Sequence, residues 1–480
     1  MNFLDASAVL LTFAAIFAYI NFRFIKLPNT IGIMLIGLFF STILIALGDY
    51  IPAVSRAADH FVEGIDFDKT LMQGLLSYLL FAGALHVNLS DLKDQKRLVA
   101  TLATLGVIIS TVLTGTLFFF LFPLLGFKIP FIWCLVLGAI ISPTDPVAVL
   151  GILKKAKVPK SLETKITGES LFNDGVGVVV YLALLGIAMS NLNDTAASHE
   201  TTPVAAIHDN VHSDHNTSSS DETNLAVNPS PDHTTEEEHN EHGESHAHEA
   251  QGFLGITKLF VVEVAGGILW GALLGAVGYY LLRSIDNYQV EVLITLALVT
   301  GGYRAASAMH ISGPLAMVVT GLMIGNHARK LAMSEVTRSH VDKFWELIDE
   351  ILNAVLFLLI GLELFVLDLS WPAMLAGVLA IVLGLGSRFL AVSLPVHVLK
   401  NHQEFSPGVI RILTWGGIRG GISVALALGI PEAFEHRNTF LVITYVVVIF
   451  SIAVQGLTLG KVVARYLKKE SASASDAPLT

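Results

Sequence analysis

Residues 131–153 read FIWCLVLGAIISPTDPVAVLGIL, an apolar run interrupted in its middle by two prolines and an aspartate. The run is long enough to cross the hydrocarbon core of a bilayer as a helix. Proline removes a backbone donor and pushes the residue before it out of helical geometry, which affects Ser142 and Asp145. We therefore expect a membrane helix that is unwound around residues 142–146, with free carbonyls and the Asp145 carboxylate available to a cation. The alternative is a simple proline kink, in which Asp145 caps the second half of the helix.

Similar apolar runs recur through the chain of 480 residues. Hydrophobic residues make up 53% of the chain and charged residues 14%, too few to cover one water-soluble domain of this length. Thirteen runs, most of about 17 to 25 residues, could each span a bilayer as a helix. They lie near residues 6–22, 28–48, 71–90, 98–122, 131–153, 165–190, 256–282, 289–308, 312–326, 345–367, 371–391, 408–430 and 439–462. The expected fold class is an all-α polytopic membrane protein with about 13 transmembrane helices, because β-barrel strands would alternate polar and apolar residues.

The basic residues predict the orientation of these helices. Short cytoplasmic loops of membrane proteins collect Lys and Arg, and most of the 29 basic residues fall in alternate connections. Thirteen spans place those connections in the cytoplasm if the N-terminus lies outside and the C-terminus inside. This assignment puts Arg388 in a cytoplasmic connection. The expected divisions are membrane helices in residues 1–190 and 253–466, an extracytoplasmic loop in residues 191–252, and a short cytoplasmic tail in residues 467–480.

The loop of residues 191–252 differs in composition from the rest of the chain. It contains 13 Asp or Glu, no Lys or Arg, and nine of the 17 histidines, and without apolar periodicity we expect it to be disordered. Its densest histidines are weak candidate metal ligands: His239, His242, His246 and His248. The alternatives are a solvated linker, a loop that binds zinc or concentrates cations, and a pH sensor. Outside the loop the charges nearly balance, and no basic stripe suited to nucleic acid is present.

Polar residues also open the sixth run, where residues 168–175 read GESLFNDG. Four-residue spacing places Ser170 and Asp174 on one line of a helix, and Glu169 and Asn173 on the next. An ionised carboxylate inside a dry bundle is costly, so Asp174 is a candidate to hold either a proton or a metal ion. Asn173 cannot titrate, which leaves this pair one proton site instead of two. The alternative is a satisfied polar cluster that holds helices together.

The twelfth run contains four glycines around one arginine, because residues 415–422 read WGGIRGGI. We expect a second break at residues 416–421. In the topology above, the fifth and twelfth runs cross the membrane in opposite directions, as the broken helices of inverted repeats do. Arg419 keeps its charge and needs a buried anion, for which Glu169 or Asp145 is available. The alternative is that the arginine reaches the membrane surface.

These motifs together resemble the NhaP/NHE-type sodium/proton antiporters of the monovalent cation:proton antiporter superfamily. The resemblance rests on residues 142–149, 168–174 and 416–426, and it covers nearly the whole chain apart from the acidic loop. It implies that the two broken helices cross. It also implies that the aspartate at Asp174 carries a proton and a cation by turns.

The resemblance further implies a set of ligands and an assembly. The implied cation ligands are Asp145, the backbone of Thr144, and Ser170. Glu169 and Arg419 are implied to form a structural ion pair. An asparagine at Asn173 implies electroneutral one-for-one exchange, and the family resemblance implies a homodimer. Some relatives add an acidic residue from the third helix, but residues 71–89 contain none.

We therefore expect a secondary antiporter of the cell (inner) membrane that exchanges Na⁺, or also Li⁺ or K⁺, for H⁺. It would serve pH and sodium homeostasis and need no cofactor, with competition at Asp174 coupling the two fluxes. A divalent-metal (zinc) transporter is one alternative, but it requires His and carboxylate groups inside the spans. A cation channel is another, and it needs no titrating group. An enzyme is the least expected class, because no nucleophile and base pair or cofactor loop is visible.

Overall fold

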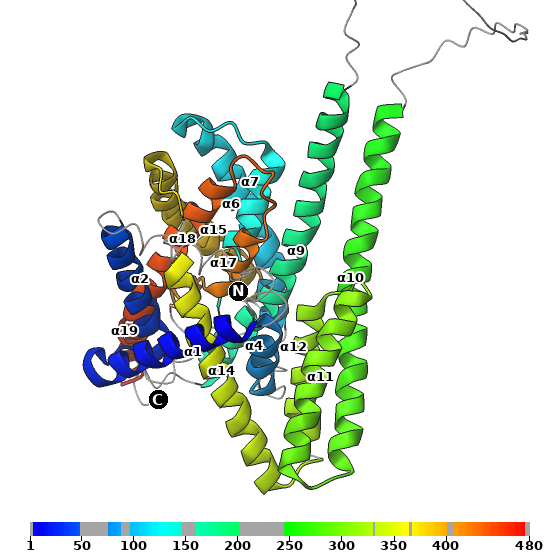
Figure 1. The fold of residues 1–480 in the computed structure, drawn as a ribbon, viewed down its shortest axis with the longest axis vertical. Helices are drawn as coiled ribbons and strands as arrows, with labels where there is room; N and C mark the ends of the chain where they lie inside the picture. Colours follow the sequence, from blue (N-terminus) through cyan, green and yellow to red (C-terminus); the bar gives the residue numbers. More distant parts are fainter. Residues whose placement is uncertain are drawn as a thin grey trace, which may run out of the picture.

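The computed structural model describes residues 3–48, 75–87, 97–145, 149, 160–200, 244–329, 332–363, 367–400 and 408–475. Within these ranges the regular elements are all helices, and there is no strand (Figure 1). In chain order they are α1 (Phe3–Ile20), η1 (Asn21–Ile25), α2 (Asn29–Gly48), α4 (Leu76–Leu85), η3 (Leu102–Gly106), α6 (Val107–Leu121), η4 (Phe122–Leu125), α7 (Phe131–Ile141), α9 (Lys160–Glu200) and α10 (Glu244–Arg283). They continue with α11 (Tyr288–Ala308), α12 (Gly313–Met323), η5 (Ile324–Ala328), α14 (Glu335–Glu363), α15 (Trp371–Leu399), α16 (Val409–Trp415), α17 (Gly421–Leu428), α18 (Arg437–Phe450), η6 (Ser451–Gly456) and α19 (Leu457–Ser475).

Each of the thirteen apolar runs contains a helix in the described part of the chain. Seven segments are long and apolar enough to cross a bilayer alone. They are Ser7–Ile25, Arg97–Leu125, Lys165–Met189, Val262–Arg283, Tyr288–Ala308, Trp371–Leu399 and Arg437–Tyr466. The all-α prediction is confirmed for the described residues, whereas thirteen crossings and the placement of the two termini stay predictions.

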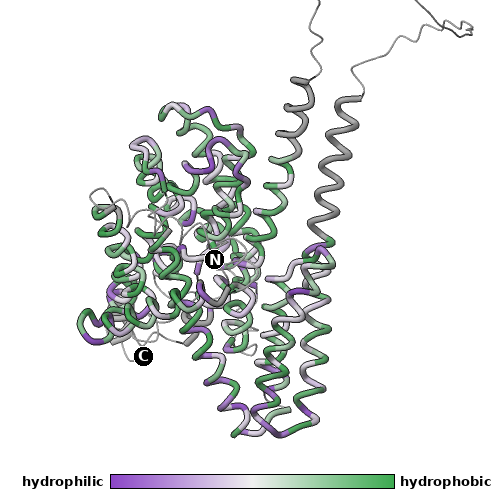
Figure 2. Tube along the Cα trace, viewed as in Figure 1, coloured by the Kyte–Doolittle hydropathy of each residue, from purple (hydrophilic) through white to green (hydrophobic). Residues whose placement is uncertain are grey.

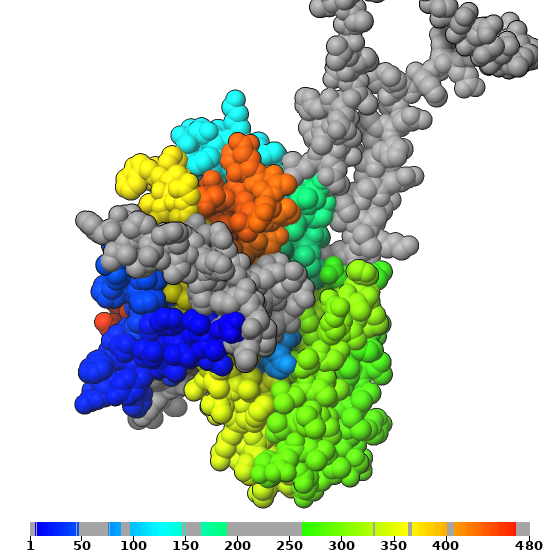
Figure 3. Space-filling model, viewed as in Figure 1, coloured from blue at the N-terminus to red at the C-terminus, as the bar shows by residue number. Residues whose placement is uncertain are grey.

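The outside of the helices carries large apolar side chains. Tyr19, Leu293 and Trp371 are 64%, 65% and 79% exposed, and many others resemble them. Figure 2 shows hydrophobic residues along most of the described helices. Figure 3, which is coloured by position in the sequence, shows that the described parts of α10 and α11 lie on the visible face of the molecule. So much exposed apolar surface is unfavourable in water but suits lipid. The protein is therefore a multi-pass membrane protein.

The buried side chains form two clusters that meet at α14. The first half of α14, with Val341 and Trp345, packs with α4, α11 and α12. The second half, from Val355 to Leu362, packs with α1, α2, α7 and the pair α16 and α17. α9 also contributes to both clusters. These two helices therefore join the two clusters.

Small residues let α10 and α12 approach closely. A Cβ atom on Gly267 would lie 2.7 Å from the Ser312 carbonyl oxygen, and one on Gly275 would lie 2.7 Å from Met323 Cβ. Gly271, between them, faces α12 in the same way. This spacing of four residues is the small-residue packing common between membrane helices, and here it joins two helices of one chain.

The ends of the acidic loop differ from the predicted disorder. α9 continues to Glu200 and α10 begins at Glu244, so residues 191–200 and 244–252 are helical (Figure 1). A helix that is already nucleated by packed apolar residues extends easily into residues of adequate helix propensity, such as Ala and Glu. The remaining residues of the loop, 201–243, lie outside the described residues.

Candidate ion-binding site

The first predicted break is observed at the end of α7. Ser142 caps that helix: its amide and its hydroxyl both donate to the Gly138 carbonyl, at 3.0 and 2.7 Å. Thr111 of α6 donates to the Ser142 hydroxyl at 3.1 Å. Residues 143–145 are not helical, and residues 146–148 lie outside the described residues. The chain therefore leaves helical geometry where the prolines predict it.

The second predicted break separates α16 from α17 at residues 416–420. It contacts the first break directly, because the Asp145 amide donates to the Ile418 carbonyl at 2.7 Å, and we refer to this contact as the crossing. A Cβ atom on Gly420 would overlap the Asp145 carboxylate, and one on Gly417 would lie 2.8 Å from Arg388 Nε. Glycine is thus required at position 420 for the two unwound segments to approach each other, and at position 417 for the Arg388 side chain of α15 to pass beside the second break.

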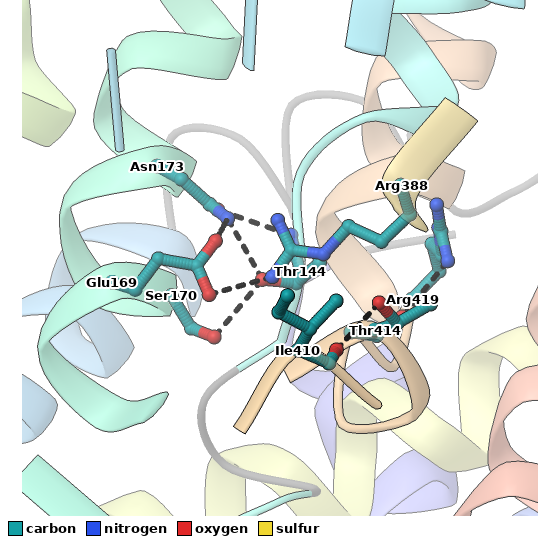
Figure 4. A network of polar contacts seen from close by, with 9 residues as sticks. Thr144, Glu169, Ser170, Asn173, Arg388, Ile410, Thr414 and Arg419 are labelled. Carbon is teal, nitrogen blue, oxygen red and sulfur yellow. Dashed lines mark hydrogen bonds and ion pairs between the residues drawn. The ribbon is translucent and has the colours of Figure 1, made fainter. Parts of the chain in front are cut away.

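One face of α9 lies against the first break. Glu169, Ser170, Asn173 and Asp174 are each at most 1% exposed, and Thr144 is fully buried. Asn173 accepts from the Thr144 amide at 3.0 Å, and its Nδ2 donates to Thr144 Oγ1 at 2.8 Å and to Glu169 Oε1 at 3.1 Å. Ser170 Oγ lies 2.9 Å from Thr144 Oγ1. Figure 4 shows the side chains of Glu169, Ser170 and Asn173 pointing from one helix toward Thr144.

The ion pair of Glu169 corrects the sequence prediction. Glu169 Oε2 accepts from Arg388 Nη2 at 2.6 Å, and both side chains are nearly fully buried. The predicted partner is Arg419, and the predicted place of Arg388 is a cytoplasmic connection. Both assignments are wrong, because α15 continues to Leu399 and carries Arg388 inside the bundle, where it reaches Glu169 (Figure 4).

Arg419 instead donates to backbone carbonyls. Its Nε donates to Ile141 at 2.9 Å, its Nη1 to Gly417 at 2.9 Å, and its Nη2 to Gly384 at 3.4 Å. Unwound helix ends leave carbonyls without amide partners, and a guanidinium has five donors to satisfy them. Arg419 therefore joins the end of α7, the second break and α15. It is 2% exposed, so the alternative that it reaches the surface is wrong.

Asp174 differs from its neighbours in its contacts. Among the residues that the structure describes, none donates a hydrogen bond to either carboxylate oxygen, although both oxygens are buried. The side chains that act on it electrostatically are Asp145 and Glu169, both acidic. An ionised carboxylate in such surroundings needs a positive partner, whereas a protonated one does not. The position can therefore accommodate a proton or a small cation.

The candidate metal ligands of the acidic loop are not assembled by the described structure. His239 and His242 lie outside the described residues, and His246 and His248 lie near the start of α10. Within the described ranges, no group of three or more His, Cys, Asp or Glu side chains could hold a metal ion.

Arg388 is the site residue that the sequence analysis missed as a buried cation. A signal was present, because the apolar residues continue past position 391 to Leu399 and make the helix long enough to bury Arg388 well inside it. The expected run of residues 371–391 ends too early, which places the arginine in a cytoplasmic connection. Since Arg388 and Glu169 are 219 residues apart, no local pattern could pair them.

The end of α7 and the interruption between α16 and α17 meet beside buried carboxylates within a bundle of apolar helices, an arrangement typical of secondary ion transporters. Residues 10–465 match the family model described as "Sodium/hydrogen exchanger, transmembrane". The chain is 44% identical over 470 residues to the Na(+)/H(+) antiporter NhaP of Pseudomonas aeruginosa, with 96% of each chain covered. It is 30% identical over 442 residues to the Na(+)/H(+) antiporter NhaH of Halobacillus dabanensis, with 91% of each chain covered.

The fold is similar to that of the sodium proton antiporter MjNhaP1 from Methanocaldococcus jannaschii. The TM-score is 0.63, the identity is 16%, and the match covers 97% of this chain and 100% of that one. This likeness concerns the fold, whereas the family follows from the match over residues 10–465. The chain belongs to the sodium/hydrogen exchanger family, which consists of secondary transporters and not of enzymes.

Proposed function

We propose that this protein exchanges Na⁺ for H⁺ across the membrane, and that Asp174 carries either ion by turns. The observation that carries the proposal is the environment of Asp174, a buried carboxylate with acidic neighbours and no hydrogen-bond donor among the described residues. A side chain in that position can be neutral with a proton or neutralised by a cation. The family and the names of its relatives supply the identity of the cation.

Competition for one carboxylate couples the two fluxes. When Na⁺ enters, it displaces the proton from Asp174, and when the proton returns, it displaces Na⁺. The proposed additional Na⁺ ligands are Asp145, the backbone of Thr144, and Ser170, all oxygen donors of the kind that a hard cation prefers. A movement of one part of the bundle against the other would expose this site to each side in turn. The same site would accept Li⁺ or K⁺ if its oxygen atoms can close around them.

We assign Asn173 a positioning role in this exchange. Its amide group bonds the Thr144 amide, the Thr144 hydroxyl and Glu169, so its oxygen and nitrogen are both engaged. It holds the first break at a set distance from α9. Because Asn173 is neutral, Asp174 is the one proton carrier of the pair, which supports electroneutral exchange of one Na⁺ for one H⁺.

The first prediction concerns Asp174. Asp174→Asn removes the carboxylate but keeps its shape, so we expect Na⁺-dependent proton movement to fall to background while the protein accumulates normally. The measurement is dye-monitored proton flux in everted membrane vesicles after addition of Na⁺. Asp368→Asn, which changes an exposed aspartate between α14 and α15, is the matched control and should retain the wild-type flux. Full exchange by Asp174→Asn would reject the mechanism.

We further propose that the protein works as a homodimer in the cell membrane and serves pH and sodium homeostasis. The transported ions are Na⁺ and H⁺, and the proposal requires no cofactor. A zinc transporter remains the rival suggested by the histidines of the acidic loop. Nothing in the described part of the chain favours it, since the site beside the breaks consists of oxygen ligands without histidine.

A further inference from the structure

The break between α16 and α17 is held by a residue from the last part of the chain. α16 ends at Trp415, and the carbonyls of its last turn have no amide partners four residues ahead in a continuing helix. The Gly416 amide satisfies Ile412, and the Gly417 amide satisfies Thr414, within the turn itself. The Trp415 carbonyl, in contrast, accepts from Gln455 Nε2 at 3.0 Å, across 40 residues of sequence.

The amide of Gln455 is oriented by a second contact. Ser451 Oγ donates to Gln455 Oε1 at 2.7 Å, and both side chains are 1% exposed. The opposite orientation of the amide would place Oε1 against the Trp415 carbonyl, so that two acceptors would face each other without a proton. The arrangement therefore forces the Nε2 group toward the end of α16.

The helix that carries Gln455 is locally distorted. Ser451–Gly456 forms the π-helical segment η6 between α18 and α19. π-helical turns are unfavourable by themselves and occur often at functional sites. Here the distorted segment contains Gln455, which contacts the second break. Gln455 and Thr458 both bond Trp415, the last residue of α16. Thr458 Oγ1 accepts from Trp415 Nε1 at 2.9 Å, so Trp415 is held at its backbone and at its indole ring.

α19 also supports α16 along its length. Arg411 Nη1 donates to the Tyr466 hydroxyl at 2.9 Å, and Gly408 lies directly against the Tyr466 ring. A Cβ atom on Gly416 would lie 3.8 Å from Leu459 Cδ1, which places α19 beside the break itself. These contacts make α16 and α19 one unit, with Gln455 at the end that faces the crossing.

We infer that Gln455, oriented by Ser451, is a positioning residue for the exchange reaction: it holds α16 in its broken form and so sets the affinity of the crossing for the transported cation. This inference rests on the proposed function. The C-terminal end of a helix carries partial negative charge, and α16 directs that end toward the crossing beside Asp145. Without the Gln455 donor, the Trp415 carbonyl is buried and unpaired, and α16 relieves this by shifting or by extending into the glycines.

The test is Gln455→Leu, which keeps the volume of the side chain but removes its donor. We expect the Na⁺ concentration for half-maximal exchange to rise about tenfold in reconstituted liposomes. The reason is that an unpaired buried carbonyl lowers the equilibrium constant for the broken form of α16 by about tenfold or more. The maximal rate should change less. Ser451→Ala, which keeps the donor but frees its orientation, should show a smaller rise in the same quantity. The matched control is Thr444→Val, whose buried hydroxyl donates to the Phe440 carbonyl of its own helix.

Each result has one meaning. A half-maximal Na⁺ concentration equal to that of Thr444→Val in both Gln455→Leu and Ser451→Ala would overturn the inference. A loss of maximal rate with unchanged half-saturation would also overturn it, because that is what general damage to packing produces. If Gln455→Leu does not accumulate, Ser451→Ala decides the matter alone. Asp174→Asn, measured in parallel, tests the proposed function separately. If the proposed function is wrong, Asp174→Asn will show wild-type exchange, whatever the Gln455 and Ser451 variants do.

Discussion

At Glu169, a buried carboxylate is neutralised by a guanidinium that comes from another helix. The Glu169–Arg388 pair lies next to the hydrogen bonds of Asn173 and Thr144, so its geometry is transmitted to the first break. A buried ion pair gains little over apolar residues of the same size, but removal of one partner leaves an uncompensated charge. The pair is therefore a sensitive point of the structure, although it lies beside the proposed ion position and not in it.

The second prediction follows from this pairing. Arg388→Met strands the Glu169 charge and should destabilise the protein by roughly 3–5 kcal/mol. We expect little protein in the membrane and a lowered melting temperature in detergent. Adding Glu169→Gln to Arg388→Met removes both charges and should recover much of the loss.

The same Glu169→Gln change should not rescue Arg419→Met, because Arg419 bonds the carbonyls of Ile141, Gly417 and Gly384 instead of the carboxylate. Melting temperatures of the single and double variants, compared in one thermodynamic cycle, measure both couplings. A larger coupling of Glu169 to Arg419 than to Arg388 would contradict the pairing described above.

At the scale of the elements, the two breaks have different causes, proline in the first and glycine in the second. Prolines end α7 because they lack an amide and restrict the residue before them. Glycines open the segment between α16 and α17, and they also leave room for the other chain segment to pass. The hydrogen bond from the Asp145 amide to Ile418 then joins the two breaks. The ion position is thus built where two segments have lost their own helical hydrogen bonds.

The third prediction tests the close approach at this crossing. Gly420→Ala adds a methyl group where the Asp145 carboxylate lies, so either the carboxylate or the break must move. Overpacking of this kind typically destabilises by about 1–3 kcal/mol, and we expect Na⁺-dependent proton flux to fall at least tenfold. Gly386→Ala is the control, because a Cβ atom there meets no described atom within 4 Å. Equal flux in the two variants would show that the crossing tolerates the displacement.

At the scale of the whole molecule, the charges buried around the site determine whether transport moves net charge across the membrane. Asp145, Glu169 and Asp174 lie in the same region as Arg388 and Arg419, and all five are at most 8% exposed. One carboxylate, Asp174, is free of described donors and can alternate between proton and cation. Exchange of one monovalent cation for one proton leaves this local balance unchanged in each half of the cycle.

The fourth prediction is that the pH gradient reached at steady state does not depend on membrane voltage. A tenfold Na⁺ gradient, worth about 1.4 kcal/mol, should sustain one pH unit whatever the potential. The measurement uses proteoliposomes in which a K⁺ gradient with valinomycin sets the voltage while a dye reports internal pH. A steady-state pH gradient that rises or falls systematically with the imposed voltage would contradict one-for-one stoichiometry.

Local sequence patterns were sufficient to predict the helical class and the positions of both breaks. They also predicted that Glu169, Ser170, Asn173 and Asp174 share one face of a helix. These features depend on residues that are near neighbours along the chain, through the constraints of proline and glycine and the periodicity of the helix. The apolar runs followed from the length that a bilayer requires.

Three contacts could be read from the packed bundle alone: the arginine that neutralises Glu169, the carbonyls that Arg419 bonds, and the bond from Gln455 to the end of α16. Each of these contacts joins helices that are far apart in sequence, and two equally charged arginines cannot be told apart by composition. The choice depends on how far α15 continues and on which face it presents, and these are set by the packing of the whole bundle. Local chemistry determines where a helix breaks, whereas packing determines what the broken ends meet.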